Sequence, residues 1–189
     1  MTAISLNLES LTSQLTHEQF YELCLANQDV VMERSPQGEL IIMPPVGGES
    51  GRKEATYIIK LGIWNEQTGL GEVFSSSTVF SLPGGGDRSP DAAWVKLERW
   101  NTLTPEQRKK FPPICPDFVI ELRSESDRLK PLQNKMQEYL QSGLRLGWLI
   151  NPQDQTVEIY RPGQEVEVLP LPAILSGEDV LSGFSLEIN

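Results

Sequence analysis

Two short segments each place a carboxylate at the end of an apolar strand. Residues 116–128 read PDFVIELRSESDR, so Glu121 lies inside an apolar run and Arg123 follows it two places later. Residues 89–97 read SPDAAWVKL, so Asp91 precedes a second run that begins with small side chains. Carboxylate oxygens are the ligands that Mg²⁺ prefers, and these two acids are therefore candidate metal ligands.

A lysine on the next expected helix is the third candidate. The apolar positions of that helix recur at helical spacing and form a stripe of Leu132, Met136, Tyr139 and Leu140. Lys135 falls within or beside this stripe, so its ammonium either extends to water or reaches over the sheet edge toward Glu121. Beside a metal ion that acidifies a water molecule, an ammonium can orient that water or stabilise transition-state charge. This combination of groups is suited to phosphodiester hydrolysis.

The strand around Glu121 divides its side chains between two faces. One face is expected to carry Asp117, Val119, Glu121 and Arg123, and the other Phe118, Ile120 and Leu122. The end of a parallel strand is where α/β sheets place their chemistry. Burying the two charges without partners would cost on the order of several kcal/mol. Glu121 and Arg123 therefore either pair with each other or are satisfied by other groups of the site.

The preceding sequence supplies elements that could position these residues. Thr16 and Gln19 resemble a capping box that opens a first helix. A hairpin of residues 30–34 and 39–43 follows, and then a helix over about 50–65. The apolar positions expected to face the core from that helix are Ala55, Ile58, Ile59, Gly62 and Ile63.

The later sequence alternates short strands with one helix. Strands are expected over residues 71–77, 78–82, 89–97, 117–123, 145–150, 156–162 and 165–170, and the helix over 129–142. The two apolar strands flanking that helix are joined by a helical crossover, which predicts a parallel pair. We therefore expect an α/β or α+β fold, with one domain over residues 1–189, a mixed sheet flanked by helices, and a loose arm over 1–15. A β-rich sandwich with appended helices is the second option.

The charge distribution limits the choice of partner. The net charge is −10, yet residues 88–145 carry 11 basic and 8 acidic side chains. An acidic protein neutralises few phosphates, so only weak nucleic-acid affinity is expected. No apolar run approaches the roughly 20 residues of a membrane helix, and no signal pattern opens the chain. Together with the isolated Cys24 and Cys115, this favours a cytoplasmic protein that does not bind membranes.

Taken together, the motifs resemble a known family. SPDAAWV, PDFVIELRS, a helix with Lys135 four places before Tyr139, and GLRLGWLINP are similar to the Uma2 family over about residues 20–185. PPVGGES at the second helix fits the same pattern. That family is placed in the PD-(D/E)XK restriction-endonuclease-like superfamily, which implies a mixed sheet flanked by helices. Many superfamily members carry an acid on the first core helix, for which Glu49 is the candidate, with Glu54 behind it.

The resemblance also implies roles for the residues on the strands. The superfamily signature is an Asp followed by an acid-x-Lys on the next strand. Asp91 matches the first position and Glu121 the second, whereas Arg123 stands where the signature has lysine. Because arginine stays protonated and cannot act as a base, the role of the lysine would pass to Lys135.

Two classes of function follow from these residues. The first is a Mg²⁺-dependent endonuclease acting on DNA, in which Mn²⁺ can substitute for Mg²⁺. Asp91 and Glu121 would hold the metal, Lys135 would assist the water, and Arg123 would hold a phosphate or orient Glu121. A homodimer or a separate targeting partner would supply the remaining affinity for DNA. The second is a catalytically inactive binding or assembly module on the same fold, in which the charged residues form a structural network.

Overall fold

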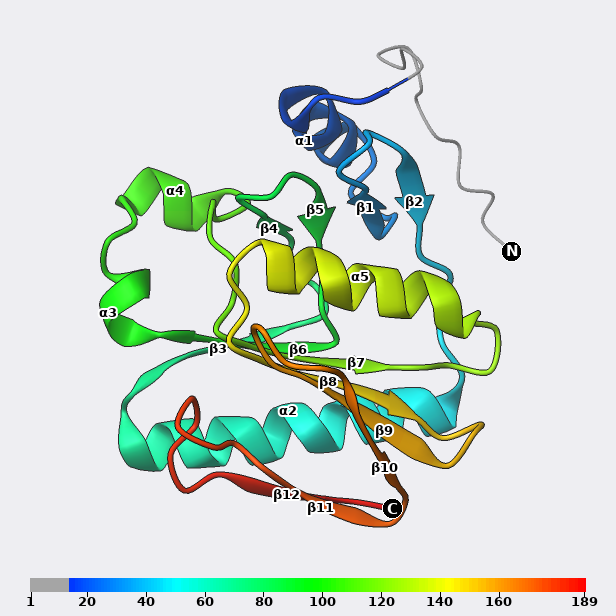
Figure 1. Ribbon diagram of the computed structural model, residues 1–189. Helices are drawn as coiled ribbons and strands as arrows, with labels where there is room; N and C mark the ends of the chain where they lie inside the picture. The colour runs from blue at the N-terminus through cyan, green and yellow to red at the C-terminus, as the bar shows by residue number, and fades with distance from the viewer. Residues whose placement is uncertain (1–13) are drawn as a thin grey trace.

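A six-stranded mixed sheet forms the centre of the protein, whose computed structural model describes residues 14–189 (Figure 1). The strand order is β10-β9-β8-β7-β6-β3, and β7 and β8 are parallel while the other neighbours are antiparallel. The strands are β3 (Gly71–Ser75), β6 (Ala92–Lys96), β7 (Phe118–Leu122), β8 (Leu146–Asn151), β9 (Thr156–Tyr160) and β10 (Glu167–Pro170). The parallel pair predicted from the helical crossover is therefore confirmed.

Two long helices cover the two faces of this sheet (Figure 1). Helix α5 (Leu129–Gln141) lies on one face and α2 (Gly48–Thr68) on the other. A small antiparallel pair packs on the α2 side, formed by β11 (Ala173–Ser176) and β12 (Ser185–Ile188). The segment between β6 and β7 contains two short helices, α3 (Leu97–Trp100) and α4 (Pro105–Lys109). The expected mixed α/β fold is confirmed, and a β-rich sandwich does not form.

A second, four-stranded sheet is built around the N-terminal hairpin. Its order is β2-β1-β5-β4, and its members are β1 (Met32–Arg34), β2 (Leu40–Ile42), β4 (Phe80–Ser81) and β5 (Asp87–Arg88). Helix α1 (His17–Ala26) packs beside this sheet and begins with the predicted capping box of Thr16 and Gln19. Strand β5 leads into β6 through Ser89, Pro90 and Asp91, so this short link joins the two sheets.

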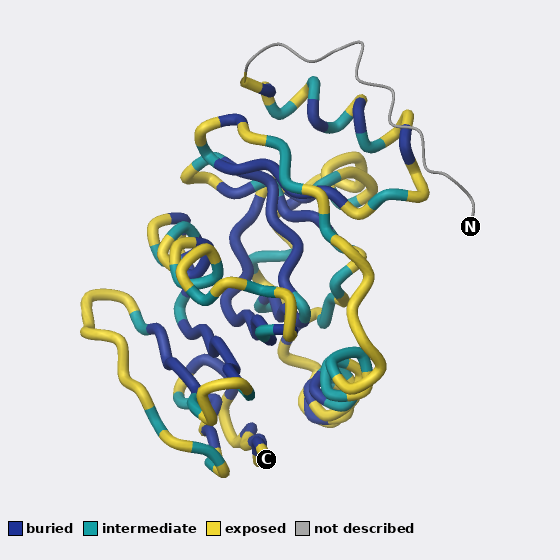
Figure 2. Tube along the Cα trace, turned by 90° about the vertical axis from the view of Figure 1, so that its right-hand side faces the viewer, coloured by how far each residue is buried: buried dark blue, intermediate teal, exposed yellow. Residues whose placement is uncertain are grey.

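Strand β7 divides its side chains between two hydrophobic clusters, as the alternation predicts. Phe118, Ile120 and Leu122 pack in the cluster under α2, whereas Val119 packs with residues of α5. Figure 2 shows the central strands buried along their length and the surrounding loops exposed. Because Glu121 shares the face of Val119, its carboxylate is directed to the α5 side of the sheet.

The predicted core face of α2 is wrong in part. The buried residues of this helix are Tyr57, Leu61 and Trp64, whereas Ile59 and Ile63 are 59% and 50% exposed. The expected stripe followed the isoleucines and gave no weight to the larger aromatic side chains one position away. Aromatic residues bury more area each, and here they determine which side of the helix faces the sheet.

Residues 1–13 lie outside the described part of the chain, so the loose arm expected there is not described. Leu15, at the end of the expected arm, is buried, and its N–H donates to the carbonyl of Gly38 at 2.8 Å. Among residues 14–189, no helix combines the length and the apolar character needed to span a membrane.

Candidate active site

Glu121 lies at the end of β7, where two side chains of α5 bind its carboxylate. The Lys135 Nζ is 2.8 Å from Glu121 Oε1, and the Tyr139 hydroxyl donates to the same oxygen at 3.1 Å. Lys135 also donates to Glu121 Oε2 at 3.0 Å. The Glu121 side chain is only 3% exposed, so these contacts take the place of water around it.

Asp91 lies next to Glu121, directly before the neighbouring strand β6. Ala92, which opens β6, is opposite Ile120 of β7, and this register places Asp91 beside the end of β7. The Asp91 Oδ2 accepts a hydrogen bond from the N–H of Leu122 at 2.6 Å. The backbone pairing of β6 with β7 therefore holds the two candidate metal ligands side by side, at the start of β6 and the end of β7.

Lys135 reaches the sheet rather than water. Its side chain is 6% exposed, and its ammonium contacts Glu121, Glu33 Oε1 at 2.7 Å and the carbonyl of Ser89 at 3.0 Å. An ammonium has three N–H donors, so these partners match its full donor capacity. Of the two orientations that the sequence left open for this lysine, the buried one is observed.

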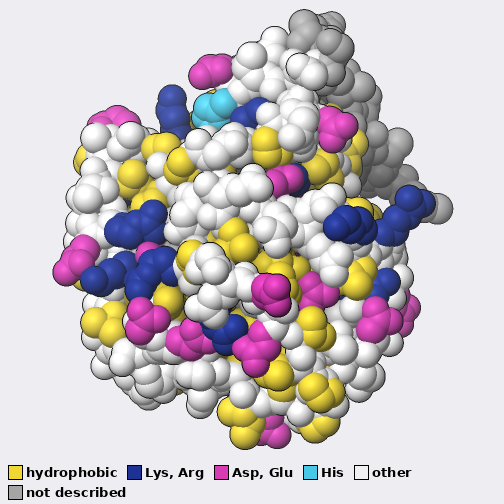
Figure 3. All heavy atoms as spheres, viewed as in Figure 1, with side chains coloured by type: hydrophobic (Ala, Val, Ile, Leu, Met, Phe, Trp, Pro, Cys, Tyr) yellow, Lys and Arg dark blue, Asp and Glu magenta, His cyan; other side chains and the backbone are white. Residues whose placement is uncertain are grey.

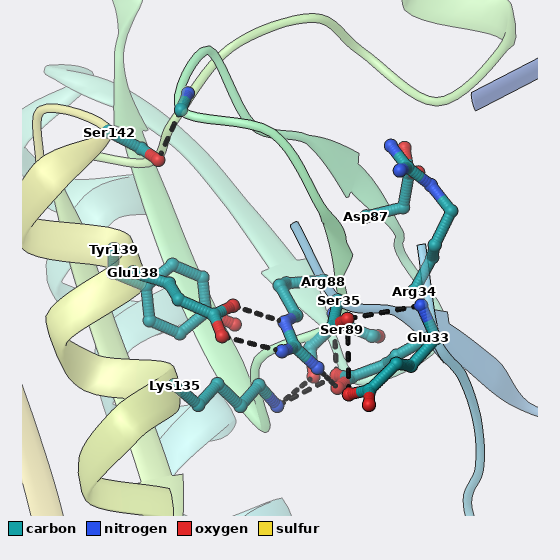
Figure 4. A network of polar contacts seen from close by, with 12 residues as sticks. Glu33, Arg34, Ser35, Asp87, Arg88, Ser89, Lys135, Glu138, Tyr139 and Ser142 are labelled. Carbon is teal, nitrogen blue, oxygen red and sulfur yellow. Dashed lines mark hydrogen bonds and ion pairs between the residues drawn. The ribbon is translucent and has the colours of Figure 1, made fainter. Parts of the chain in front are cut away.

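A chain of ion pairs that the sequence analysis did not identify surrounds Lys135 (Figure 4). Arg88 donates from Nη1 to Glu33 Oε2 at 2.9 Å, and from Nε and Nη2 to the two oxygens of Glu138 at 2.7 and 2.9 Å. The N–H of Ser89 donates to Glu33 Oε1 at 2.8 Å. Glu33 comes from β1, Arg88 from β5 and Glu138 from α5. The network therefore links the second sheet to the helix that carries Lys135.

Arg123 does not join this cluster. It follows the last residue of β7, and its Nη1 contacts Asn151 Oδ1 at 3.1 Å and Asp154 Oδ2 at 3.0 Å. Its Nε donates to the carbonyl of Asp127 at 3.2 Å. The guanidinium is thus turned to the β8–β9 turn and forms no ion pair with Glu121.

The two candidate acids of α2 differ in their surroundings. The Glu49 side chain is 82% exposed and pairs with Arg52 at 2.9 Å. Glu54, one and a half turns later, is half-buried, accepts a hydrogen bond from the Ser76 hydroxyl, and is close enough to Asp91 to raise its pKa. The structure thus brings Glu54 close to Asp91 and leaves Glu49 exposed at the wall of the open cavity described below. Glu54 lies seven residues before the buried Leu61, a spacing that could have identified it.

Glu54 is therefore expected to matter more than Glu49 for any chemistry at this site. Glu54→Gln should lower the activity of the site at least about tenfold, because it removes a charge that acts directly on Asp91. Glu49→Gln should leave activity within about twofold, because an exposed pair contributes little. Initial rates of the phosphodiester cleavage expected from the sequence, measured side by side for the two variants, check this prediction. Equal losses of activity would contradict it.

The cluster carries more negative than positive charge. Burial, with smaller contributions from Glu54 and Glu33, raises the pKa of Asp91 to about 6 against the opposing effects of Lys135 and of the Leu122 N–H. Burial, with Asp91 and Glu33, also raises the pKa of Glu121. Burial lowers the pKa of Lys135, but its carboxylate neighbours outweigh this and hold it above its ordinary value. The lysine is therefore charged at neutral pH, while the carboxylates repel one another.

The donor chemistry of this cluster fits a divalent cation. Asp91 and Glu121 offer carboxylate oxygens, and Mg²⁺ is commonly bound through one or two carboxylates together with water and phosphate. The raised pKa of Asp91 results mainly from burial, and the smaller effects of Glu54 and Glu33 are those of negative charges that a cation would offset. Within residues 14–189, no group of three or more histidine, cysteine, aspartate or glutamate side chains is arranged to hold a metal. A cation bound at this cluster would therefore have only two protein ligands among these residues, Asp91 and Glu121.

An open cavity of about 680 Å³ lies beside the cluster. The start of α2, the segment after β7 and the β8–β9 turn line it, and its residues include Gly47, Lys53, Leu122, Arg123, Ser124 and Gln153. Leu122 belongs both to this lining and to the contact with Asp91. The cavity has space for a substrate of nucleotide size and reaches Leu122, the neighbour of Glu121 in the chain, whereas Asp91 and Glu121 themselves do not line it.

The comparisons with known proteins bear on the family and the fold of the chain. A family model named Uma2 and described as "Putative restriction endonuclease" matches residues 17–189. The chain belongs to the Uma2 family. The predicted resemblance is thereby confirmed, and the match covers both sheets and every residue of the Asp91 and Lys135 cluster. A search of curated proteins found no match.

A solved structure has the same fold as this Uma2 chain. It is a crystal structure from Anabaena variabilis, titled as a "putative nuclease belonging to DUF820". The TM-score is 0.71 and the sequence identity 23%, and the match covers 82% of this chain and 86% of that chain. At this identity the likeness supports the fold, and the roles of individual residues depend on the contacts described above.

Proposed function

We propose that this Uma2 protein is a metal-dependent endonuclease that hydrolyses phosphodiester bonds in DNA, with Mg²⁺ or Mn²⁺ as its cation. The observation that carries the proposal is the convergence of Asp91, Glu121 and Lys135, from three separate elements, at one sheet edge. The cavity that begins at Leu122 and membership of a family described as "Putative restriction endonuclease" support it.

Each side chain has a role that follows from its contacts. Asp91 and Glu121 would hold the metal, which supplies polarisation of a phosphoryl oxygen and a more acidic water. Lys135 places a fixed positive charge beside Glu121, where it can orient the attacking water or stabilise charge on the phosphate. Tyr139 donates to Glu121 and fixes the direction of its carboxylate. Arg123 lines the cavity, where it can contact a phosphate of the substrate.

The surface favours modest affinity for the substrate. Figure 3 shows lysine and arginine side chains interspersed with acidic ones across one face, rather than gathered in a single basic band. With a net charge of −10, the protein would neutralise few phosphates. We propose that a homodimer supplies the additional contacts to DNA and that the protein acts in the cytoplasm.

One observation favours a second function. Lys135 and Tyr139 already bind the carboxylate of Glu121, so the charged residues can persist as a structural network without a metal. On this reading the protein is a catalytically inactive binding or assembly module. The two functions differ in whether a cation can compete with Lys135 for Glu121.

Two measurements together test the proposed nuclease. Crystals soaked in Mn²⁺ should show anomalous density between Asp91 and Glu121, because manganese scatters anomalously and prefers the same oxygen ligands. Supercoiled plasmid should be nicked with Mg²⁺ or Mn²⁺ and left intact with EDTA. Absence of both density and nicking would reject the nuclease and favour the inactive module.

Cleavage should depend on pH through Asp91 and Glu121. The pKa of the Asp91 carboxyl is raised to about 6, so a proton occupies it below that pH and it cannot ligate a cation. At a fixed, subsaturating Mg²⁺ concentration, the rate should therefore fall about tenfold per pH unit from about pH 8 to about pH 6, where Glu121, whose pKa is raised to about 8, takes up a proton. It should fall more steeply below about pH 6, where Asp91 is protonated as well. A pH–rate profile checks this. A rate that is flat from about pH 5 to about pH 8 would mean that Asp91 and Glu121 do not ligate the metal.

A further inference from the structure

The N-terminal hairpin supplies a carboxylate to the site from a different sheet. Glu33 is the middle residue of β1, and its side chain is 2% exposed. Its Oε1 is 2.7 Å from the Lys135 Nζ, compared with 2.8 Å for the contact of Lys135 with Glu121. The ammonium is therefore shared between two carboxylates at similar distances.

Glu33 is held firmly by groups other than Lys135. Ser89 donates its N–H to one oxygen and Arg88 donates to the other. Arg88 is fixed in turn by its two contacts with Glu138, which lies three residues after Lys135 on α5. Figure 4 shows Lys135 and Glu138 directed from α5 toward this group. The contacts close a ring, so the position of Glu33 is defined relative to the helix that carries the lysine.

The two carboxylates that share Lys135 have different neighbours. Glu121 lies beside Asp91 and is a proposed metal ligand, so a cation would compete with the ammonium for its oxygens. Glu33 is bound to Arg88 and to the backbone of Ser89, and both are fixed donors. If a cation engages Glu121, the ammonium retains Glu33 and the Ser89 carbonyl as partners.

We propose that Glu33 is the positioning residue for Lys135, whose ammonium it keeps in place when a divalent cation engages Glu121. The inference rests on the proposed function in assigning Lys135 to the reaction. It makes the N-terminal hairpin part of the site, although the hairpin contributes no metal ligand. The positioning role depends on the contacts of the Lys135 ammonium with Glu33 and with the Ser89 carbonyl, and on the donors that hold Glu33 in place.

The first test measures Lys135 directly and requires neither metal nor activity. At one fixed pH, the exchange of the lysine ammonium protons with water is followed by ¹⁵N NMR, with the signal assigned by its loss in Lys135→Met. A protected signal is expected in the wild type and in Glu39→Gln, an exposed acid on the same hairpin. Glu33→Gln should exchange about tenfold faster or more, because one charge-assisted hydrogen bond is lost. Exchange equal to that of Glu39→Gln would overturn the proposal, as would the absence of a protected signal in the wild type.

The second test adds saturating Mg²⁺ to the same samples. The wild-type signal should persist, because Glu33 and Ser89 retain the ammonium, whereas the Glu33→Gln signal should be lost. In plasmid cleavage, Glu33→Gln should lower kcat about 100-fold with little change in KM, as expected when a catalytic group is misplaced and substrate binding is intact. A rise in KM alone would overturn the positioning role.

The outcomes separate this inference from the proposed function. If the wild type neither binds Mg²⁺ nor cleaves DNA, the nuclease is rejected, while the metal-free exchange still decides whether Glu33 holds Lys135. If Glu33→Gln fails to fold, Glu33→Asp keeps the charge toward Arg88 but ends one methylene short of Lys135. In Glu33→Asp the Lys135 ammonium protons should also exchange faster than in the wild type. An exchange rate equal to that of Glu39→Gln would overturn the proposal.

Discussion

Glu121→Gln should reduce cleavage by more than about 100-fold while the protein remains folded. Losing a residue that hydrogen-bonds to a metal ligand typically lowers metal affinity or activity about 10–100-fold. Glu121 is proposed as a ligand itself, so a larger loss is expected. The amide keeps the shape of the side chain and can still accept hydrogen bonds from Lys135 and Tyr139. Initial rates of plasmid nicking in Mg²⁺, together with Mn²⁺ affinity measured by calorimetry, check this prediction.

The control for Glu121 is an acid with no contact with the cluster. Glu98 is 80% exposed and pairs only with Lys96 among the described ion pairs, so Glu98→Gln should cleave at the wild-type rate. If Glu121→Gln and Glu98→Gln nick plasmid equally, the nicking does not come from this site and indicates a contaminating nuclease.

Lys135→Met should have the largest effect on stability and should also abolish cleavage. The thioether of methionine fills the volume of the lysine stem, but Glu121 loses its only cationic partner among residues 14–189. Glu33 keeps Arg88 as a cationic partner and the N–H of Ser89 as a hydrogen-bond donor. Removing one member of a buried ion pair typically costs about 3–5 kcal/mol of unfolding free energy. Cleavage should fall about 100-fold or more, because the fixed charge near the phosphate is lost. Urea denaturation and initial rates measure the two effects.

The stability loss in Lys135→Met should depend on pH in a defined direction. Without the lysine, the pKa of the buried carboxyls rises further, so the folded state binds protons more readily than the unfolded state. The stability that the folded state gains from this proton binding is present at low pH. It is lost as the pH rises through the pKa that these carboxyls have in the folded state. The deficit relative to wild type should thus be larger at about pH 8 than at about pH 5.

The matched control is Lys130→Met on the same helix, because Lys130 is exposed. It should change the unfolding free energy by less than about 0.5 kcal/mol at either pH. A pH-independent deficit in Lys135→Met would mean that the loss comes from packing rather than from charge.

Local patterns were sufficient to predict the main elements of the site. Alternation in β7 placed Glu121 on one face, and the 3.6-residue period of α5 placed Lys135 beside the apolar stripe. A crossover helix between two apolar strands predicted their parallel pairing. Each inference uses residues within a few positions of one another, where geometry follows directly from the backbone period.

The contribution of Glu33 could not be predicted in this way. In a three-residue strand of a hairpin, a glutamate between a methionine and an arginine has the pattern of a solvent-facing residue, yet all three are buried. Its partners Arg88 and Lys135 are far away in the sequence, and no local period connects them. Glu54 differs, because its seven-residue spacing from Leu61 is visible in the sequence, but the predicted core face of α2 does not include Leu61.

The link between the two sheets has a consequence for how this protein can vary. Ser89, Pro90 and Asp91 connect β5 to β6, with Arg88 of the ion-pair network before them and a proposed metal ligand as their last residue. A single residue inserted in this tripeptide would shift Asp91 relative to Leu122 or Arg88 relative to Glu33. Deletions and insertions should instead be tolerated in the exposed segment around α4, where no part of the cluster is anchored.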